Sequence, residues 1–512
     1  MLQLLIDERV VEVPAGSTVL DAAGRLGLTI PTLCYDRQCQ PFSSCLVCVV
    51  RDARTGKLIP SCVAPAEEGM IIKTGAPDVL DARKTAIELL LSDHVGDCEG
   101  PCRRACPLFL DAPSMLHQVL AGDVNAAVRT VCESIALPRV VSRLCHAPCE
   151  KACRRRQKDE SVAILLVERF VSEADAPRVP APPAERGRLA VVGAGPAGLA
   201  AAHALRQAGY GCTVFNASAE PGGALRQVRP EQLPAMALQA DLNALRCPGI
   251  EFSCGTRLGT DVTLSALREK FSAVILAMGE AAHSEMAAFG LRPPSADTRH
   301  VGAVLTDGSG LVACGSMVKP RTHVVQAMAD GQGAARLVLA FLESRTAIHR
   351  RFDSHLGGVD ELEMAEFMKD AAPIPRVLPA SRASEFARPE AAAESGRCLH
   401  CDCRKTATCR LRSCADELAA SQSAFRGDER SRFERILQHA DVVYEPGKCI
   451  RCGLCVQLTA QGKEALGLTF IGRGFDVRIG VPFNDSLSGA LRQTAAACVK
   501  ACPTAALAFK TE

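Results

Sequence analysis

One glycine-rich turn constrains the fold of this 512-residue chain more than any other stretch. An apolar run, Leu189 to Val192, leads into Gly193, Gly195 and Gly198, and an Ala-rich helical stretch follows. A second apolar run, residues 212–215, comes at the spacing of a βαβ unit. Glycines at these positions permit a tight turn and a close backbone approach to a pyrophosphate at a helix N-terminus. The stretch therefore predicts a dinucleotide-binding fold.

Cysteine is the second constraint, because the chain contains 26 cysteines and most of them stand in short motifs. The N-terminus has acidic residues where a secretion signal needs a basic start, and no apolar run is long enough to span a membrane. We therefore expect a cytoplasmic protein, in which cysteines bind metal rather than form disulfides. A net charge of +2 argues against nucleic acid as a partner. The length predicts roughly three to five domains.

The first metal motif lies in residues 1–78, where apolar alternation also predicts a hairpin over 2–13 and a helix over 18–26. Its C-x10-C-x2-C-x13-C spacing suits a [2Fe–2S] cluster, with structural zinc as the alternative. The words TVLDAA and IPTLCY accompany it, and Cys39 is interpreted as a bystander. The segment resembles the β-grasp ferredoxin domain of the large iron–sulfur subunit of respiratory complex I and related hydrogenase subunits. The ligands so expected are Cys34, Cys45, Cys48 and Cys62.

Residues 79–180 hold two further cysteine knots, HVGDCEGPCRRACP and RLCHAPCEKACRRR. Six cysteines and one histidine cannot fill two four-ligand sites without another ligand. The block resembles the helical domain of the glutamate synthase small subunit and dihydropyrimidine dehydrogenase, which holds two [4Fe–4S] clusters. The resemblance implies a first cluster on Cys98, Cys102 and Cys153, and a second on Cys106, Cys145, Cys149 and Glu168. The family's first cysteine is missing here, and we expect His94, four residues before Cys98, to replace it in the first cluster. The plainer alternative is that His94 caps a helix and Glu168 is solvated.

The resemblance to the glutamate synthase small subunit continues through residues 187–345 and implies a Rossmann-like domain that binds FAD. Three positions depart from that family: Asn216 replaces an acidic residue for the ribose, Gln232 a basic residue, and Ser316 an Asp for the ribityl chain. Each change costs on the order of 1 kcal/mol of binding, so a flavin-free relic of the fold stays an alternative. The cofactor-binding residues implied are Gly193, Gly195, Gly198, Asn216, Gly222, Gly223, Gly315 and Ser316.

In that family an NAD(P)H-binding domain is inserted after the strand that corresponds to residues 271–279, FSAVILAMG. Here only 35 residues separate Gly279 from Gly315. A domain needs at least ~50 residues. A second glycine pattern, at residues 308–313, begins an apolar run instead of following one and is discarded. We therefore expect that the chain does not bind NAD(P)H by the family's route. The Pro-rich residues 176–188 read as a linker.

The C-terminal third carries two more metal motifs after a helical connector, residues 346–395, in which no chemistry is seen. In residues 396–440 a C-x2-C-x-C-x5-C motif suits an iron–sulfur cluster and resembles a motif of iron–sulfur flavoproteins, with zinc as the alternative. Residues 441–512 resemble the complex I large subunit, including GRGFDV and PFNDSLSG, and suit one [4Fe–4S] cluster. His400, Cys414 and Cys498 are left as substitute ligands or spares. The expected ligands are Cys398, Cys401, Cys403 and Cys409, then Cys449, Cys452, Cys455 and Cys502.

The expected whole is a multidomain α+β and α/β protein: a β-grasp [2Fe–2S] ferredoxin, a helical iron–sulfur domain, a Rossmann-like FAD domain and a C-terminal ferredoxin-like domain. It would hold one [2Fe–2S], three to four [4Fe–4S] clusters and FAD. Clusters carry single electrons and a flavin one or two, so we expect an electron-transferring oxidoreductase subunit. Its expected partners are a diaphorase-type NADH/FMN subunit and a ferredoxin, hydrogenase or formate dehydrogenase module. The alternatives are a self-sufficient NAD(P)H oxidoreductase and a non-catalytic zinc scaffold.

Overall fold

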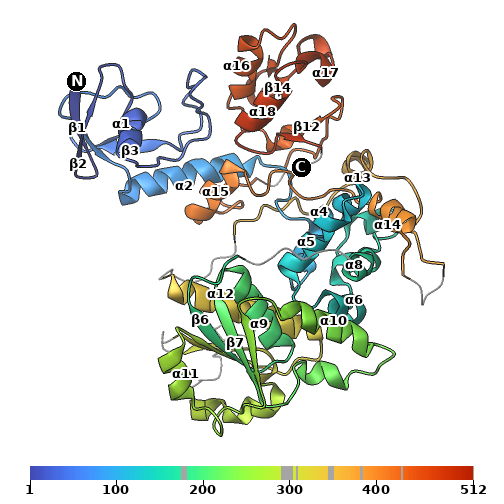
Figure 1. The fold of residues 1–512 in the computed structure, drawn as a ribbon. Helices are drawn as coiled ribbons and strands as arrows, with labels where there is room; N and C mark the ends of the chain where they lie inside the picture. Colours follow the sequence, from blue (N-terminus) through green and yellow to red (C-terminus); the bar gives the residue numbers. More distant parts are fainter. Residues whose placement is uncertain are drawn as a thin grey trace. The chain divides into compact units, whose positions relative to one another are not determined.

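The computed structural model describes residues 1–174, 182–289, 304–306, 310–343, 351–380, 385–427 and 430–510. The chain forms two compact units (Figure 1). The first unit comprises residues 1–100, 351–369 and 400–512, and the second comprises residues 101–350 and 370–399. Residues 176–181 of the predicted linker, and much of the stretch between Gly279 and Gly315, lie outside the described residues.

The N-terminal part of the first unit is a five-stranded mixed sheet in the order β2-β1-β5-β3-β4. Leu4, Ile6, Val11 and Val13 alternate with exposed residues and are buried on one face, which confirms the predicted hairpin. Thr18 begins helix α1 with a capping box, so the predicted helix is also confirmed. The bounds are β1 (Leu2–Ile6), β2 (Arg9–Val13), α1 (Val19–Arg25), β3 (Val49–Asp52), β4 (Lys57–Pro60) and β5 (Ile71–Lys73).

The rest of the first unit combines short helices with two two-stranded sheets, β12–β15 and β13–β14. Ile87 of α2, Leu411 of α15 and Leu454 of α16 share one buried core, so distant segments of the chain pack together. The bounds are α2 (Pro77–Ser92), α13 (Glu361–Met368), α15 (Arg410–Glu417), β12 (Val442–Tyr444), α16 (Leu454–Gln461), β13 (Thr469–Ile471), β14 (Arg478–Gly480), α17 (Leu487–Ala490), α18 (Ala495–Ala501) and β15 (Leu507–Phe509).

The second unit begins with a group of short helices. Asp111 and Asp123 cap two of them, because their side chains accept hydrogen bonds from the backbone nitrogens of Ser114 and Ala126. Met115, Val131 and Val167 lie on the inner faces of these helices and are buried. The bounds are α3 (Pro101–Ala105), α4 (Ala112–Leu120), α5 (Val124–Ser134), α6 (Pro138–Leu144), α7 (Pro148–Lys151), α8 (Ile164–Glu173) and α14 (Arg388–Ser395).

A six-stranded sheet in the order β10-β11-β9-β6-β7-β8 forms the rest of the second unit. β11, β9, β6, β7 and β8 run parallel, and β6 lies between β7 and β9. β6 and β7 lie side by side in Figure 1. This is the doubly wound order, which places a crevice where the strand order reverses, beyond the carboxyl end of β6. The bounds are β6 (Arg188–Val192), α9 (Pro196–Gln207), β7 (Gly211–Asn216), α10 (Ala235–Leu245), β8 (Ile250–Cys254), α11 (Leu264–Lys270), β9 (Val274–Leu276), β10 (Val304–Thr306), β11 (Leu311–Ala313) and α12 (Val324–Leu342).

Two helices approach each other closely beside this sheet. α12 packs on α9, and a Cβ at Gly331 would lie 1.9 Å from the carbonyl oxygen of Ala197. Only glycine fits at that contact. None of the helices in the described residues is long and apolar enough to cross a membrane.

Candidate functional site

The four N-terminal cysteines gather in the first unit, although a long loop separates them in sequence. Cys34 and Cys45 lie between α1 and β3, Cys48 precedes β3 and Cys62 follows β4. All four are buried, Cys45 at 5% exposure and the others at 1–2%. A hydrogen bond from the Cys45 thiol lowers the pKa of Cys34 to about 5, and one from Cys62 lowers the pKa of Cys48 to about 6. The same hydrogen bonds raise the pKa of the donating thiols, Cys45 and Cys62, so iron binding by all four would release protons.

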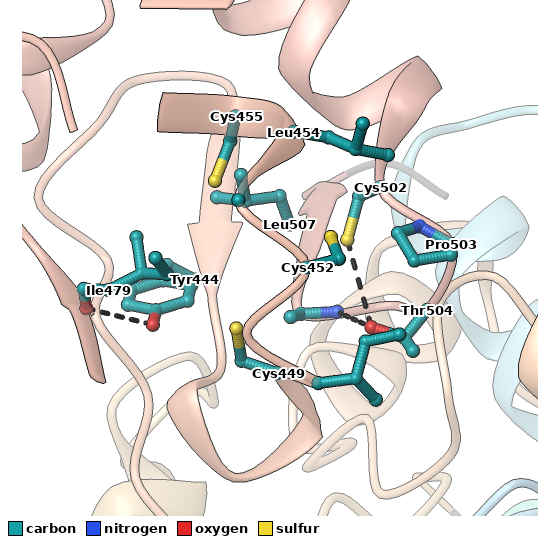
Figure 2. A pocket seen from close by; sticks show the side chains of 13 residues that line it. Tyr444, Cys449, Cys452, Leu454, Cys455, Ile479, Cys502, Pro503, Thr504 and Leu507 are labelled. Carbon is teal, nitrogen blue, oxygen red and sulfur yellow. Dashed lines mark hydrogen bonds between the residues drawn. The ribbon is translucent and has the colours of Figure 1, made fainter. Parts of the chain in front are cut away.

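The C-terminal cysteines surround one small cavity in the first unit. Figure 2 shows Cys449, Cys452, Cys455 and Cys502 around the same space, with Tyr444 at its edge. Burial raises the pKa of Cys449 to about 11 and that of Cys452 to about 12, so metal binding there would release protons. The four sulfur donors fit a [4Fe–4S] cluster.

Cys498 lies beside Cys455 but does not line the cavity. Its side chain is fully buried, and its thiol lies 3.8 Å from the carbonyl oxygen of Cys455, to which it donates. The geometry therefore favours Cys498 as a spare and Cys502 as the fourth donor, as the sequence indicated.

A third donor set lies in the second unit. Glu168 of α8 is 3% exposed, and its Oε1 has no hydrogen-bond partner. Burial raises the pKa of Glu168 to about 8. The same carboxylate acts electrostatically on Cys106, Cys145 and Cys149, whose thiol pKa values burial also raises. A buried carboxylate oxygen without a partner, beside one buried and two half-buried cysteines, fits a metal cluster better than it fits the solvated alternative.

Two predicted donor sets are distributed over both units. His94 and Cys98 belong to the first unit, whereas Cys102 and Cys153 belong to the second. Of the next set, Cys398 belongs to the second unit, and Cys401, Cys403 and Cys409 belong to the first. Cys414 is buried beside Glu417, Arg410 and Arg83. Both sets therefore stay predictions.

A single metal ion needs donors within a tight tetrahedron, as in structural zinc sites. Among the residues that the structure describes, no group of three or more His, Cys, Asp or Glu side chains is arranged to hold one ion. A cluster of several irons spreads its protein ligands more widely than one ion does. The absence of a single-ion site among the described residues therefore leaves iron–sulfur clusters open to the donor sets above, whose sulfur chemistry and burial suit them.

The glycine turn has the geometry that a dinucleotide requires. Gly193 has a φ of +110°, and a Cβ there would lie 2.2 Å from the carbonyl oxygen of Ala277, just after β9. A Cβ at Gly198 would lie 1.9 Å from the carbonyl oxygen of Gly193. Gly195 caps α9, and a Cβ there would meet no protein atom within 4 Å. Gly193 and Gly198 are therefore required by the fold, whereas Gly195 leaves open space at the helix N-terminus for a phosphate.

The other predicted cofactor residues gather at the same edge of the sheet. Asn216 ends β7, Gly222 donates to the carbonyl oxygen of Ala194 at 2.8 Å, and Gly315 and Ser316 follow β11. A Cβ at Gly223 would lie 2.9 Å from the Cα of Gly195. All of them therefore lie at the carboxyl ends of parallel strands, where open α/β sheets bind ligands.

Asn216 has a structural role that an acidic residue cannot fill. Its amide nitrogen donates to the carbonyl oxygens of Ser218 and Glu220, each at 2.9 Å, and its Oδ1 lies 3.4 Å from the backbone nitrogen of Ala194. A carboxylate has no donor and would lose the first two bonds. The change from an acidic residue is thus explained by the shape of the following loop, and Oδ1 still carries a lone pair for a hydroxyl.

Sequence reasoning missed a buried ion network in the first unit. Lys448 and Glu445 are each 2% exposed and form an ion pair, and Arg435 lies 3.3 Å from the same carboxylate. Burial alone would raise the pKa of Glu445, but Lys448 and Arg435 outweigh it and hold that pKa at about 2. Lys448 also acts on Cys403 and His94. The one available signal was a lysine directly before Cys449, which cannot show burial.

Three family models match parts of the chain. Residues 1–77 match a 2Fe-2S iron-sulfur cluster binding domain, and residues 93–178 match dihydropyrimidine dehydrogenase domain II, 4Fe-4S cluster. Residues 191–249 match an NAD(P)-binding Rossmann-like domain. That description names NAD(P) rather than the FAD predicted here. Because the glycine pattern is common to both dinucleotides, the assignment that stands is a dinucleotide-binding Rossmann-like domain.

Curated relatives match shorter stretches. The beta subunit of NADPH-Fe(3+) oxidoreductase from Geobacter sulfurreducens (strain DL-1 / KN400) is 35% identical over 187 residues, 35% of this chain and 28% of that protein. The beta subunit of NADP(+)-dependent formate dehydrogenase from Moorella thermoacetica is 32% identical over 217 residues, 37% of this chain and 31% of that protein. A subunit of the NADH-quinone oxidoreductase of Rhizobium meliloti (strain 1021) is 42% identical over 98 residues, 19% of this chain and 12% of that protein.

The matched part of this chain spans under a third of the length of each of these relatives. A solved NAD+-reducing [NiFe]-hydrogenase matches 99% of this chain and 87% of that chain at 12% identity, but its TM-score of 0.36 is too low to show a shared fold. The family matches confirm the resemblance that the cysteine and glycine motifs predicted: the chain carries a 2Fe–2S domain, a 4Fe–4S domain of the dihydropyrimidine dehydrogenase type and a Rossmann-like dinucleotide domain.

Proposed function

We propose that this chain is an electron-transferring iron–sulfur flavoprotein subunit of a multi-subunit oxidoreductase. It relays electrons between a diaphorase-type NADH/FMN subunit and another redox module, such as a ferredoxin, hydrogenase or formate dehydrogenase module. The three relatives named above support this proposal, because each is by name a subunit of an oxidoreductase. An iron–sulfur cluster exchanges single electrons and a flavin one or two, which is the chemistry such a relay needs.

One observation carries the proposal. A single buried core of the first unit contains Cys34, Cys409 and Cys452, one from each of three predicted metal motifs. The charge of Cys34 acts on the thiol of Cys452, so these two sites lie within electrostatic range of each other. Gln40, in the loop of the first motif, and Gln457 of α16 form reciprocal hydrogen bonds, each 2.8 Å long. Metal centres that exchange electrons must lie close together, and this packing brings their ligands together.

The test uses the full chain, purified or reconstituted without oxygen. We expect bound iron and acid-labile sulfide, and electron paramagnetic resonance signals of two nearby clusters that broaden each other when both are reduced. Cys34→Ser should remove the [2Fe–2S] signal and sharpen that of the C-terminal cluster. Cys39→Ser is the matched control, because Cys39 is buried in the same loop and is not an expected ligand. A colourless protein loaded with zinc would contradict the proposal and favour a scaffold.

A second candidate function has one observation in its favour. Residues 191–249 match an NAD(P)-binding Rossmann-like domain, which favours a chain that itself accepts electrons from NAD(P)H. The departure at Ser316, the position expected to bind the ribityl chain, weakens the FAD assignment in the same direction. Tight NADPH binding by the lone chain, with reduction of its iron, would establish this candidate in place of the relay.

A further inference from the structure

Cys98 lies beside the cysteine-rich segment at residues 400–417 of the first unit, far from it in sequence. The backbone nitrogen of Cys403 donates to the carbonyl oxygen of Cys98 at 3.1 Å, and Oγ1 of Thr406 lies 3.3 Å from the same oxygen. Cys98 and Cys403 are each 6% exposed, and Cys409 is 5% exposed. Burial raises the pKa of Cys98 to about 12, and the charges of Cys403 and Cys409 act in the same direction. The three sulfurs therefore lie within electrostatic range of one another.

His94 lies four residues before Cys98 and shares a charged neighbour, Lys448, with Cys403. Its Nδ1 is enclosed by protein and has no hydrogen-bond partner. His94 and Cys403 both lie within the field of the Lys448–Glu445 pair. The segment that follows His94 packs against residues 447–448. The backbone nitrogen of Val95 donates to the carbonyl oxygen of Gly447 at 2.8 Å. Gly96 lies so close to Lys448 that a Cβ there would be 2.6 Å from its Cε. An enclosed ring nitrogen without a partner costs folding free energy unless a ligand occupies it.

Two cations lie close to these thiols. Arg412 acts on Cys98 and is held by Glu99, whose Oε1 lies 2.6 Å from its guanidinium. Lys448 acts on Cys403 and forms an ion pair with Glu445. A cluster held by thiolates carries negative charge, which nearby cations would stabilise.

We propose that His94, Cys98, Cys403 and Cys409 hold one [4Fe–4S] cluster within the first unit. The proposal rests on the iron–sulfur function proposed above, and it replaces two ligand sets implied by the sequence. It separates His94 and Cys98 from the cysteines of the second unit and takes the two buried cysteines of the C-x2-C-x-C-x5-C motif. Histidine replaces cysteine as a ligand in some iron–sulfur centres, so this donor set is chemically sound.

The decisive experiment is a double-mutant comparison in the reconstituted full chain. Cys98→Ser and Cys403→Ser should each remove about four irons and the same electron paramagnetic resonance signal, and the double variant should also lose about four. If the two cysteines serve different clusters, the double variant loses about eight, which would overturn the proposal. Cys414→Ser, a buried cysteine of α15, is the matched control and should keep all iron. The [2Fe–2S] signal of the Cys34 set reports whether the unit stays folded.

A second variant keeps a ligand in place. His94→Cys should retain the full iron content but lose the strong nitrogen hyperfine coupling that pulsed electron paramagnetic resonance detects from a bound imidazole. The same coupling in His94→Cys as in the unchanged chain would contradict the proposal, even if the serine variants fail to fold. Failure of the proposed function looks different, because the unchanged chain would then contain little iron in any site.

Discussion

At the scale of single residues, a buried carboxylate without a partner reduces folding stability unless a ligand uses it. Glu168 is such a group, since its pKa is raised to about 8 by burial and its Oε1 has no partner. Gly195 plays the corresponding part in the dinucleotide fold, because a Cβ there would contact no protein atom and a ligand can occupy the space. The unpartnered carboxylate oxygen of Glu168 and the open space at Gly195 therefore both indicate a role in ligand binding rather than in folding.

We expect Glu168→Ala to lower the iron content by about four per chain. The metal-free chain should keep or gain stability, by about 1 kcal/mol, because a desolvated carboxyl group is removed. Iron analysis and urea unfolding of the metal-free chain check both parts. Glu173→Gln on the same helix is the control: the half-buried Glu173 carboxylate lies 3.2 Å from the guanidinium of Arg139, and the substitution should leave the iron unchanged. Full iron in Glu168→Ala would remove Glu168 from the ligands.

We expect Gly195→Ala to abolish dinucleotide binding while the melting temperature stays within a few degrees, because the added methyl group meets cofactor and not protein. Gly198→Ala should instead destabilise the fold by roughly 1–3 kcal/mol, since its Cβ would stand 1.9 Å from a carbonyl oxygen. Fluorescence of flavin released on denaturation and calorimetry measure the two effects. Retention of the cofactor by Gly195→Ala would show that the phosphate does not approach this turn.

At the scale of elements, side chains of α13 fix this helix to the segment that begins at residue 430. Glu363 accepts hydrogen bonds from Arg430 at 2.8 Å and from the backbone nitrogen of Phe433 at 2.8 Å. Phe367 of the same helix stacks on Phe433 with ring centroids 4.1 Å apart. The Arg430 hydrogen bond holds the pKa of Glu363 at about 2, well below its ordinary value.

The low folded-state pKa makes this contact depend on pH. Ionised Glu363 contributes its full stability above about pH 4.5, its ordinary pKa, and loses it as the pH falls toward about 2. Glu363→Gln should therefore lower the free energy of unfolding by roughly 2 kcal/mol at pH 7, and the difference should shrink below about pH 4.5. Urea unfolding across this range measures it, with the exposed Glu361→Gln as control. A difference that does not change with pH would mean that the carboxylate charge is not the cause.

At the scale of the whole molecule, the first unit is built from residues 1–100, 351–369 and 400–512. The second unit contains the dinucleotide fold, with few residues between its β9 and β11 in which a further nucleotide domain could be formed. The relay proposal therefore requires electrons to enter from another protein.

We expect neither NADH nor NADPH to reduce the lone, iron-loaded chain at a rate useful for turnover. Addition of a diaphorase-type NADH/FMN subunit should restore reduction, seen as bleaching of the visible absorbance without oxygen. Dithionite is the positive control for reducible iron. Prompt bleaching of the lone chain by either nucleotide would favour the self-sufficient oxidoreductase.

Local patterns in the sequence predicted the parts of the fold that depend on neighbouring residues. Alternating apolar residues predicted the β1–β2 hairpin, and the glycines at 193–198 predicted the turn between β6 and α9, because both depend on short-range backbone geometry. The Cys34–Cys62 and Cys449–Cys502 sets come together as expected, since each lies within a single small fold.

Only the tertiary structure decided which distant groups meet. No spacing rule links Cys98 to Cys403, or His94 to Lys448, because those neighbours are set by the packing of α2, α15 and the C-terminal segment around one core. The sequence by itself thus determined which chemistry the chain carries, through residue types whose effect is local. Packing determined how the donors are grouped, because burial and long-range contacts depend on the whole folded unit.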